Sequence, residues 1–153
     1  MGYRHGAHTV FEIHVHLVWT TKYRKGVLRG DVGTRLRELI RQICRSEEVE
    51  IMKGHVSSDH VHLFVSIPPQ VTISRLVQRL KGRTSHKLLA EFSHLRKAFW
   101  GRHLWARGYF CCSSGNVTDE VIKAYIEDQR HDHDGDFRIE GEAAPVEPPK
   151  PST

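Results

Sequence analysis

The sequence predicts one α+β domain with the ferredoxin-like order of elements, βαββαβ, followed by one further helix. Three observations predict it. Four runs of alternating or β-branched and aromatic residues indicate strands, apolar residues spaced by three and four indicate helices, and polar turns or prolines separate them. We expect an antiparallel sheet with two helices on one face, and with the first and third strands as central neighbours.

The first expected strand covers residues 9–19, which are rich in β-branched and aromatic side chains. A loop follows, and a helix then begins where Asp31 provides an N-cap. The apolar positions of this helix repeat at intervals of three and four: Leu36, Leu39, Ile40, Ile43 and Cys44. We expect the helix to end near Glu47.

The second and third expected strands form a hairpin. The second strand runs from about Val49 to Ser57, and a turn at Ser58 and Asp59 leads into the third, which begins at His60. Proline has no amide hydrogen to donate within a sheet, so the third strand ends before residues 68–69, which are both proline.

The rest of the domain contains two helices and a short strand. A helix from Ile73 to Leu89 has a basic face opposite its apolar face, and Gly82 is a point where it can bend. An irregular stretch then leads into a strand over residues 109–113. Thr118 is expected to cap the last helix, on which Tyr125 and Gln129 lie four residues apart and share a face.

Composition limits the class of protein. The 153 residues suffice for one ordinary hydrophobic core. No apolar run approaches the ~20 residues of a membrane helix, and no secretion signal is seen at the N-terminus, so we expect a cytoplasmic protein without a membrane partner. Cys44, Cys111 and Cys112 lack C-x-x-C spacing, which predicts reduced, packed thiols rather than disulfides or a cysteine zinc site.

The net charge of +5 is unevenly distributed. Residues 131–153 contain six acidic residues against Arg138 and Lys150 and are rich in proline, so they carry a net −4 and residues 1–130 carry +9. A basic domain with an acidic, Pro-rich end is typical of a polyanion-binding domain followed by a disordered tail. We expect the polyanion to be nucleic acid.

A candidate metal pair lies on the third expected strand. His60 and His62 are two residues apart, so on a strand the residues stand ~6.6 to 6.8 Å apart and both imidazoles leave the same side of the sheet. Asp59 at the preceding turn can hold one ligating imidazole by its second nitrogen. His14 and His16 have the same spacing on the first strand, but large apolar neighbours favour a packing role there.

Tyr125 is a candidate nucleophile. Its neighbours Val121, Ile122 and Ile126 are apolar, and taken alone they favour a tyrosine at the rim of a buried helix face. Gln129, on the same helix face, is a candidate metal ligand and favours a functional role for Tyr125. An amide oxygen is a neutral ligand, so two imidazoles and one amide would leave the charge of a divalent cation available to a phosphate. The combination suggests a metal site beside a tyrosine.

Cations and aromatic rings alternate in the irregular stretch before the last strand, as they do in proteins that stack single-stranded bases and contact the phosphate backbone. We therefore predict DNA or RNA contacts in and around it. The candidate contacts are Lys22, Arg24, Lys81, Arg83, Arg102, His103, Trp105 and Arg107.

A series of short motifs occurs in order along residues 14–129. They are residues 16–19 (HLVW), 22–24 (KYR), 59–63 (DHVHL), 68–69 (PP), 80–83 (LKGR), 100–101 (WG), 104–105 (LW), 108–110 (GYF) and 125–127 (YIE) with Gln129. In these motifs the chain resembles the single-tyrosine HUH transposases of the insertion-sequence 200/605 family. The resemblance implies a homodimer that cuts and rejoins single-stranded DNA at the hairpin-bearing ends of a small mobile element, with residues 1–130 as the transposase domain.

The resemblance also implies roles for individual residues. His60, His62 and Gln129 match the ligands of a divalent metal, Mg²⁺ or Mn²⁺, and Tyr125 matches the nucleophile that forms a 5′-phosphotyrosine. The tyrosine helix of one subunit can complete the site on its partner in this family. His14 and the adjacent cysteines, residues 111–112, have no counterpart in the family's chemistry.

Three alternatives share part of the pattern. A nucleotidyl hydrolase of the histidine-triad kind would have a third histidine where Phe64 or Val18 stands. A non-catalytic single-stranded nucleic-acid-binding module would use aromatics on a sheet but would not need Tyr125 with Gln129. Another HUH nickase, such as a relaxase or replication initiator, would share the chemistry, but the small size and Trp-rich segment favour the transposase.

Overall fold

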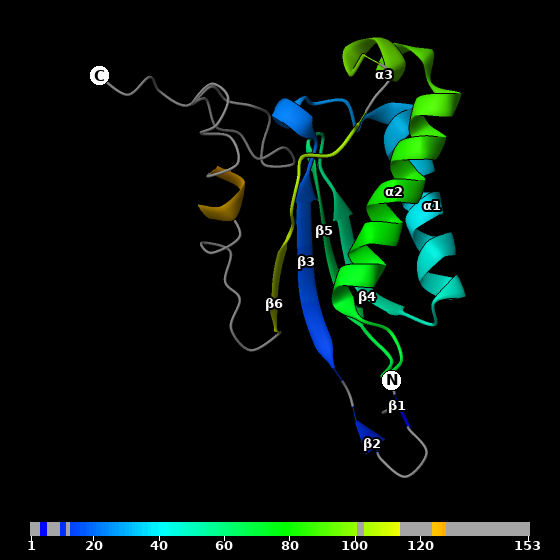
Figure 1. The fold of residues 1–153 in the computed structure, drawn as a ribbon, viewed down its shortest axis with the longest axis vertical. Helices are drawn as coiled ribbons and strands as arrows, with labels where there is room; N and C mark the ends of the chain where they lie inside the picture. Colours follow the sequence, from blue (N-terminus) through cyan, green and yellow to red (C-terminus); the bar gives the residue numbers. More distant parts are fainter. Residues whose placement is uncertain (1–3, 6–9, 12, 101–102, 114–123, 128–153) are drawn as a thin grey trace.

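An antiparallel sheet of four strands is the centre of the fold (Figure 1). The computed structural model describes residues 4–5, 10–11, 13–100, 103–113 and 124–127. The strands lie in the order β4 (Glu50–Val56), β5 (His60–Ser66), β3 (His14–Thr20) and β6 (Phe110–Ser113). The α+β fold is confirmed, and β5 and β3, the third and first of the expected strands, are the central neighbours.

Helices α1 (Gly30–Ser46) and α2 (Ile73–Glu91) both cover one face of this sheet (Figure 1). Side chains alternate along a strand, so every second residue of β3 and β5 points to the helices. These residues form the core with the apolar faces of α1 and α2. On the two central strands they are Val15, Leu17, Trp19, Val61, Leu63 and Val65.

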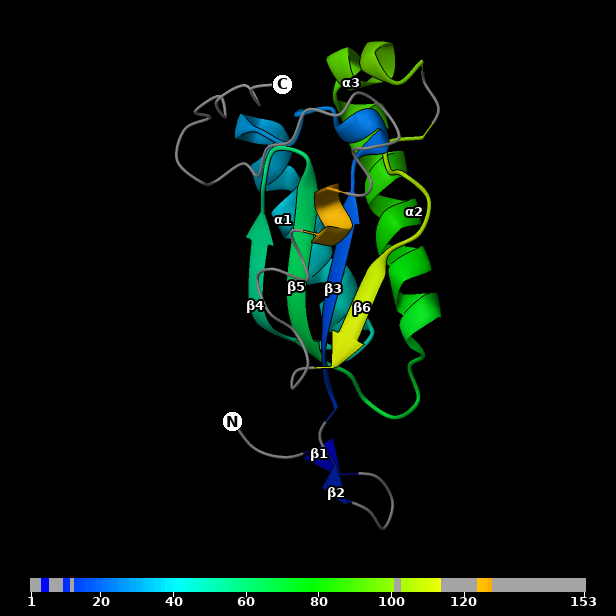
Figure 2. The same cartoon turned by 90° about the vertical axis from the view of Figure 1, so that its left-hand side faces the viewer.

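The other residues of the central strands form the face that α1 and α2 leave uncovered. The antiparallel register pairs His16 with Phe64, Val18 with His62, and Thr20 with His60. Residues paired across a sheet point to the same side. Figure 2 shows this face, with the helical residues 124–127 in orange lying over β3 and β5.

The single strand predicted over residues 9–19 is divided in the structure. Near its start, β2 (Val10–Phe11) pairs with β1 (Arg4–His5) in a separate two-stranded sheet. The strand β3 begins only at His14. A strand pattern in sequence cannot tell which partner each part of the run will find.

The helices also differ in detail from those predicted. Arg29, rather than Asp31, is the N-cap of α1. Asp31 lies in the first turn, where its negative charge interacts favourably with the helix dipole. Gly82 does not interrupt α2, which continues for 19 residues after a cap at Thr72. A short helix, α3 (Ser93–Ala98), was not predicted.

Part of the C-terminal region lies outside the described residues. Residues 124–127 are helical, in agreement with the predicted last helix over these four positions. The predicted cap at Thr118, the predicted ligand Gln129 and the predicted tail over 131–153 lie outside the described residues. Among the described helices, none is both long and apolar enough to cross a membrane.

One buried hydrogen bond joins α2 to the segment before β6, and its removal should lower stability. The buried Trp105 indole N–H donates to Thr84 Oγ1 at 2.9 Å. Thr84→Val keeps the shape but leaves this N–H without its acceptor, so we expect the free energy of unfolding to fall by about 1–3 kcal/mol in urea titrations. Thr34→Val, the same change at an exposed position of α1, should stay within about 0.5 kcal/mol of wild type. Equal losses in the two variants would contradict the role of the Thr84 hydroxyl as a buried acceptor.

Candidate active site

His60 is held in a fixed orientation at the start of β5. Its side chain is buried, and its Nδ1 lies 2.9 Å from Oδ1 of Asp59. A carboxylate only accepts hydrogen bonds, so Nδ1 carries the proton, and in the neutral ring Nε2 keeps its lone pair. This is the carboxylate–histidine arrangement that commonly orients a metal-ligating imidazole.

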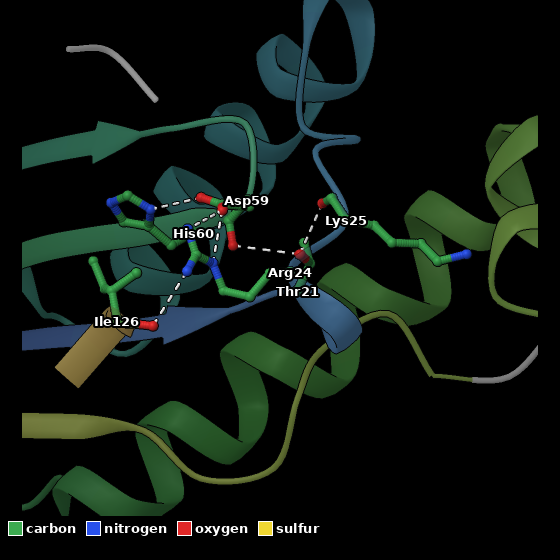
Figure 3. A network of polar contacts seen from close by, with 6 residues as sticks. All are labelled: Thr21, Arg24, Lys25, Asp59, His60 and Ile126. Atoms are coloured by element: carbon green, nitrogen blue, oxygen red, sulfur yellow. Dashed lines mark hydrogen bonds and ion pairs between the residues drawn. The ribbon is translucent and has the colours of Figure 1, made fainter. Parts of the chain in front are cut away.

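Asp59 is in turn paired with Arg24, which comes from the turn after β3 (Figure 3). Arg24 Nε donates to Asp59 Oδ2 at 2.7 Å, and its Nη2 forms an ion pair with the same oxygen. The side chains of Arg24 and Asp59 are only 5% and 8% exposed. The histidine, the carboxylate and the guanidinium therefore form one buried chain of contacts.

His62 contacts a histidine of the neighbouring strand. Its Nε2 lies 2.9 Å from Nδ1 of His16, and the His16 ring stacks on Phe64 with centroids 4.4 Å apart. The His14 ring meets the same Phe64 edge-on at 5.5 Å. The two H-x-H pairs are therefore not independent sites, because the register brings His16 of one pair against His62 of the other.

A fifth histidine joins this face from the edge strand β4. His55 pairs with His62 in the sheet, and its ring centroid lies 6.5 Å from that of His60. Burial, together with the charge of His60, lowers the pKa of His55. Sequence reasoning missed His55 because the register of β4 against β5, shifted by an irregularity between Ile51 and Lys53, is not visible in the sequence.

Tyr125 lies on the same face of the sheet as the histidines. The following residue, Ile126, is fully buried against Val18, whose partner in the register is His62. The Tyr125 ring is half-buried and lies 5.4 Å from the ring of Phe110 on β6. The apolar contacts of Ile126 thus place the tyrosine segment over the central strands, as Figure 2 shows.

The donors on this face fit a divalent cation only in part. His60 can present Nε2, whereas Nε2 of His62 faces His16. Within the described residues, no three His, Cys, Asp or Glu side chains are grouped as a metal site. The predicted third ligand, Gln129, lies outside that part of the chain. An amide oxygen is a donor that suits Mg²⁺ or Mn²⁺, whereas imidazole nitrogens are donors that later transition metals such as Zn²⁺ prefer.

Five of the predicted DNA contacts line an open groove of about 930 Å³ beside α2. The groove also contains Tyr23, whose ring is half exposed and lies 5.6 Å from the ammonium of Lys22. Its charged and aromatic lining suits a nucleic acid backbone with an unstacked base. The predicted contacts that line it are Lys22, Lys81, His103, Trp105 and Arg107.

Two of the predicted contacts in the groove, Trp105 and Lys81, make contacts that stabilise the fold. Trp105 is 6% exposed and packs edge-on against Trp19, so its indole is part of the core and not a stacking platform. Lys81 donates from Nζ to the carbonyls of Ala106 and Gly108, each at 2.8 Å, and burial lowers its pKa. The prediction of base stacking by Trp105 is therefore corrected by its burial.

The remaining predicted DNA contacts lie elsewhere. Arg83 is exposed on α2, and Arg102 is outside the described residues. Arg24 is buried with Asp59, so its guanidinium is not presented to a phosphate. Two exposed aromatics were missed, Tyr23 and the 82% exposed Trp100, because an aromatic in a loop gives no periodic signal of exposure.

The three cysteines are free, as predicted. Cys44 is buried in α1, and burial raises its pKa to about 12. Cys111 and Cys112 are partly exposed on β6. Cys112 pairs with His16 in the sheet register.

Residues 9–129 match the family described as "Transposase IS200 like". Curated proteins are also similar to most of the chain. The ISDra2 transposase TnpA of Deinococcus radiodurans is 35% identical over 123 residues, which make up 80% of this chain and 87% of that protein. The transposase for insertion sequence element IS200 of Salmonella typhimurium is 31% identical over 123 residues, 80% of each chain.

Solved structures also share the fold. A candidate transposase from Deinococcus radiodurans R1 has a TM-score of 0.74 and 32% identity, with coverage of 82% of this chain and 97% of that one. A REP-associated tyrosine transposase bound to a REP hairpin has a TM-score of 0.54 and 16% identity, with coverage of 87% and 77%. At that identity, the second likeness concerns the fold alone.

The partly buried imidazole of His16 predicts a dependence of stability on pH. Burial lowers the pKa of His16 below the ordinary value of 6.5, so near that pH the unfolded chain binds more protons than the folded chain. Its stabilising contribution is full above pH 6.5 and is lost as pH falls toward the folded pKa. In urea titrations with EDTA, wild type should lose more stability than His16→Gln between about pH 7.5 and 5.5. An equal loss in both proteins would contradict the role of His16.

Proposed function

Because this chain belongs to the IS200-like transposase family, we propose that it cleaves and rejoins single-stranded DNA at the hairpin-bearing ends of a mobile element. One observation carries the proposal beyond family membership. The segment with Tyr125 packs against Val18, the residue paired with His62, so the candidate nucleophile lies on the same sheet face as the two candidate histidine ligands. A module that only binds nucleic acid has no need of this arrangement.

Tyr125 is the proposed nucleophile. Its phenolic oxygen, after loss of the proton, attacks the phosphorus of a DNA diester and forms a 5′-phosphotyrosine, while the bond from phosphorus to the 3′ oxygen breaks and that oxygen takes up a proton. The phosphotyrosine retains the energy of the diester. The 3′-hydroxyl of another strand can therefore reverse the step, which gives strand transfer without a nucleotide cofactor.

His60, His62 and Gln129 are the proposed ligands of Mg²⁺ or Mn²⁺. When bound, the cation would neutralise the charge of the phosphate under attack. The contribution of the chain itself is orientation: Asp59 holds Nδ1 of His60, which leaves Nε2 as the donor. For His62 to donate from Nε2, its contact with His16 must open.

The groove beside α2 is the proposed binding surface for DNA. Its exposed cations and Tyr23 suit a backbone and an unstacked base. The REP-associated transposase that shares this fold was solved with a REP hairpin, and we propose a hairpin ligand here as well. The resemblance to the family also leads us to propose a homodimer in which subunits share sites, although residues 124–127 pack on the sheet of their own chain.

Replacement of the proposed nucleophile tests the function directly. Tyr125→Phe removes the attacking oxygen and keeps the ring, so single-stranded DNA from the flanks of the gene should still bind, while nicking and the covalent adduct disappear. Denaturing gels with Mg²⁺ or EDTA measure nicking and the adduct, and native gels measure binding. Tyr3→Phe, outside the matched residues, should behave as wild type. Nicking by Tyr125→Phe would exclude this nucleophile, and binding by wild type without nicking would favour the binding module.

The choice between the two H-x-H pairs has its own test. His60→Ala and His62→Ala each remove a proposed ligand and should abolish Mn²⁺-dependent nicking, whereas His14→Ala removes no proposed ligand and should preserve it. Gel assays over a range of Mn²⁺ concentrations measure the difference. Equal loss in His14→Ala would mean that the wrong pair was assigned.

A further inference from the structure

We propose that Arg24 is a positioning residue, which ties the tyrosine segment to the histidine pair through two arms of one guanidinium group. The inference rests on the proposed function, in which Tyr125 and His60 act on the same phosphate. It gives Arg24 a role inside the site, in place of the DNA contact predicted from the sequence.

The first arm fixes His60. Nε and Nη2 of Arg24 both engage Oδ2 of Asp59, and the other carboxylate oxygen, Oδ1, accepts from Nδ1 of His60 at 2.9 Å (Figure 3). A planar guanidinium restricts the orientation of the carboxylate it binds. The position of Arg24 therefore sets the orientation of the imidazole through Asp59.

The second arm holds the segment with the nucleophile. Nη1 of Arg24 donates to the backbone carbonyl of Ile126 at 3.2 Å, across 102 residues of sequence. Ile126 directly follows Tyr125, so this bond fixes the backbone beside the phenol. A backbone carbonyl as acceptor means that the tie depends on Arg24 and on the path of the chain, rather than on the side chain at position 126.

The backbone around Arg24 is built to direct its side chain inward. Tyr23 and Arg24 both adopt left-handed conformations, with φ of 60° and 53°, which are costly for residues with side chains. The Thr21 amide donates to the Asp59 carbonyl at 2.9 Å, and the Thr21 hydroxyl donates to the Lys25 carbonyl at 2.8 Å. Such costly conformations persist only where surrounding contacts hold them, and they concentrate at functional sites.

Burial separates this role from DNA binding. The Arg24 side chain is 5% exposed, so a phosphate cannot reach it without breaking the pair with Asp59. Loss of a DNA contact would weaken binding and reduce its salt dependence by about one phosphate. Loss of a positioning residue would slow the reaction of bound DNA and leave affinity unchanged.

The test separates the two arms in the full-length chain. Arg24→Lys keeps a cation for Asp59, but its single ammonium group replaces the planar guanidinium whose nitrogens contact both Asp59 and the Ile126 carbonyl. Hydrogen exchange of residues 124–127, followed by mass spectrometry, should become at least about tenfold faster, and single-turnover adduct formation should slow roughly 10- to 100-fold at unchanged DNA affinity and salt slope. Arg45→Lys, an exposed residue of α1 on the opposite sheet face, should change none of these.

A second variant guards against misfolding. If Arg24→Lys does not fold, Arg24→Met combined with Asp59→Asn removes both charges together and avoids an unpaired buried ion. The same acceleration of exchange is expected. Unchanged exchange at residues 124–127 in the folded variant, or weaker DNA binding with a smaller salt slope, would overturn the proposal. Absence of any adduct in wild type would refute the proposed function, and the exchange comparison would still decide the role of Arg24.

Discussion

The antiparallel pairing of β3 with β5 is the constraint on which the site depends. Its register decides which side chains enter the core and which remain on the opposite face, since a shift of one residue would exchange the two sets. Leu17, Trp19 and Val61 need the cover of α1 and α2, and their burial fixes the register. His60 and His62 are consequently directed away from the helices, to the face where the tyrosine segment packs.

A buried ion pair connects this face to the loop that follows β3. Two charges enclosed at 5% and 8% exposure lose much of their hydration, so the pair is favourable only because each oxygen of Asp59 has a partner. Removal of one member of such a pair typically costs about 3–5 kcal/mol. The placement of His60 and of the Ile126 carbonyl around Arg24 therefore carries a stability constraint as well as a geometric one.

Local sequence patterns predict most of the fold, because strand alternation and helical spacing are local properties. The four sheet strands and both long helices, in their order along the chain, followed from them, and the ferredoxin-like plan then placed the first and third strands side by side. Contacts between distant residues did not. The bond between His16 and His62 depends on register, the burial of Trp105 depends on the acceptor supplied by Thr84, and the inward path of Arg24 depends on two left-handed residues. For this reason Arg24 and Trp105 looked like DNA contacts in the sequence.

One sheet face brings together the proposed ligands His60 and His62 and the proposed nucleophile Tyr125. Crystals grown with Mn²⁺ and single-stranded DNA would test it most directly, through the anomalous scattering of the ion. We predict one peak at the imidazoles of His60 and His62, with the phenol of a Tyr125 from either subunit beside the same phosphate. A peak at His14 and His16, or a Tyr125 phenol distant from every bound ion, would contradict it.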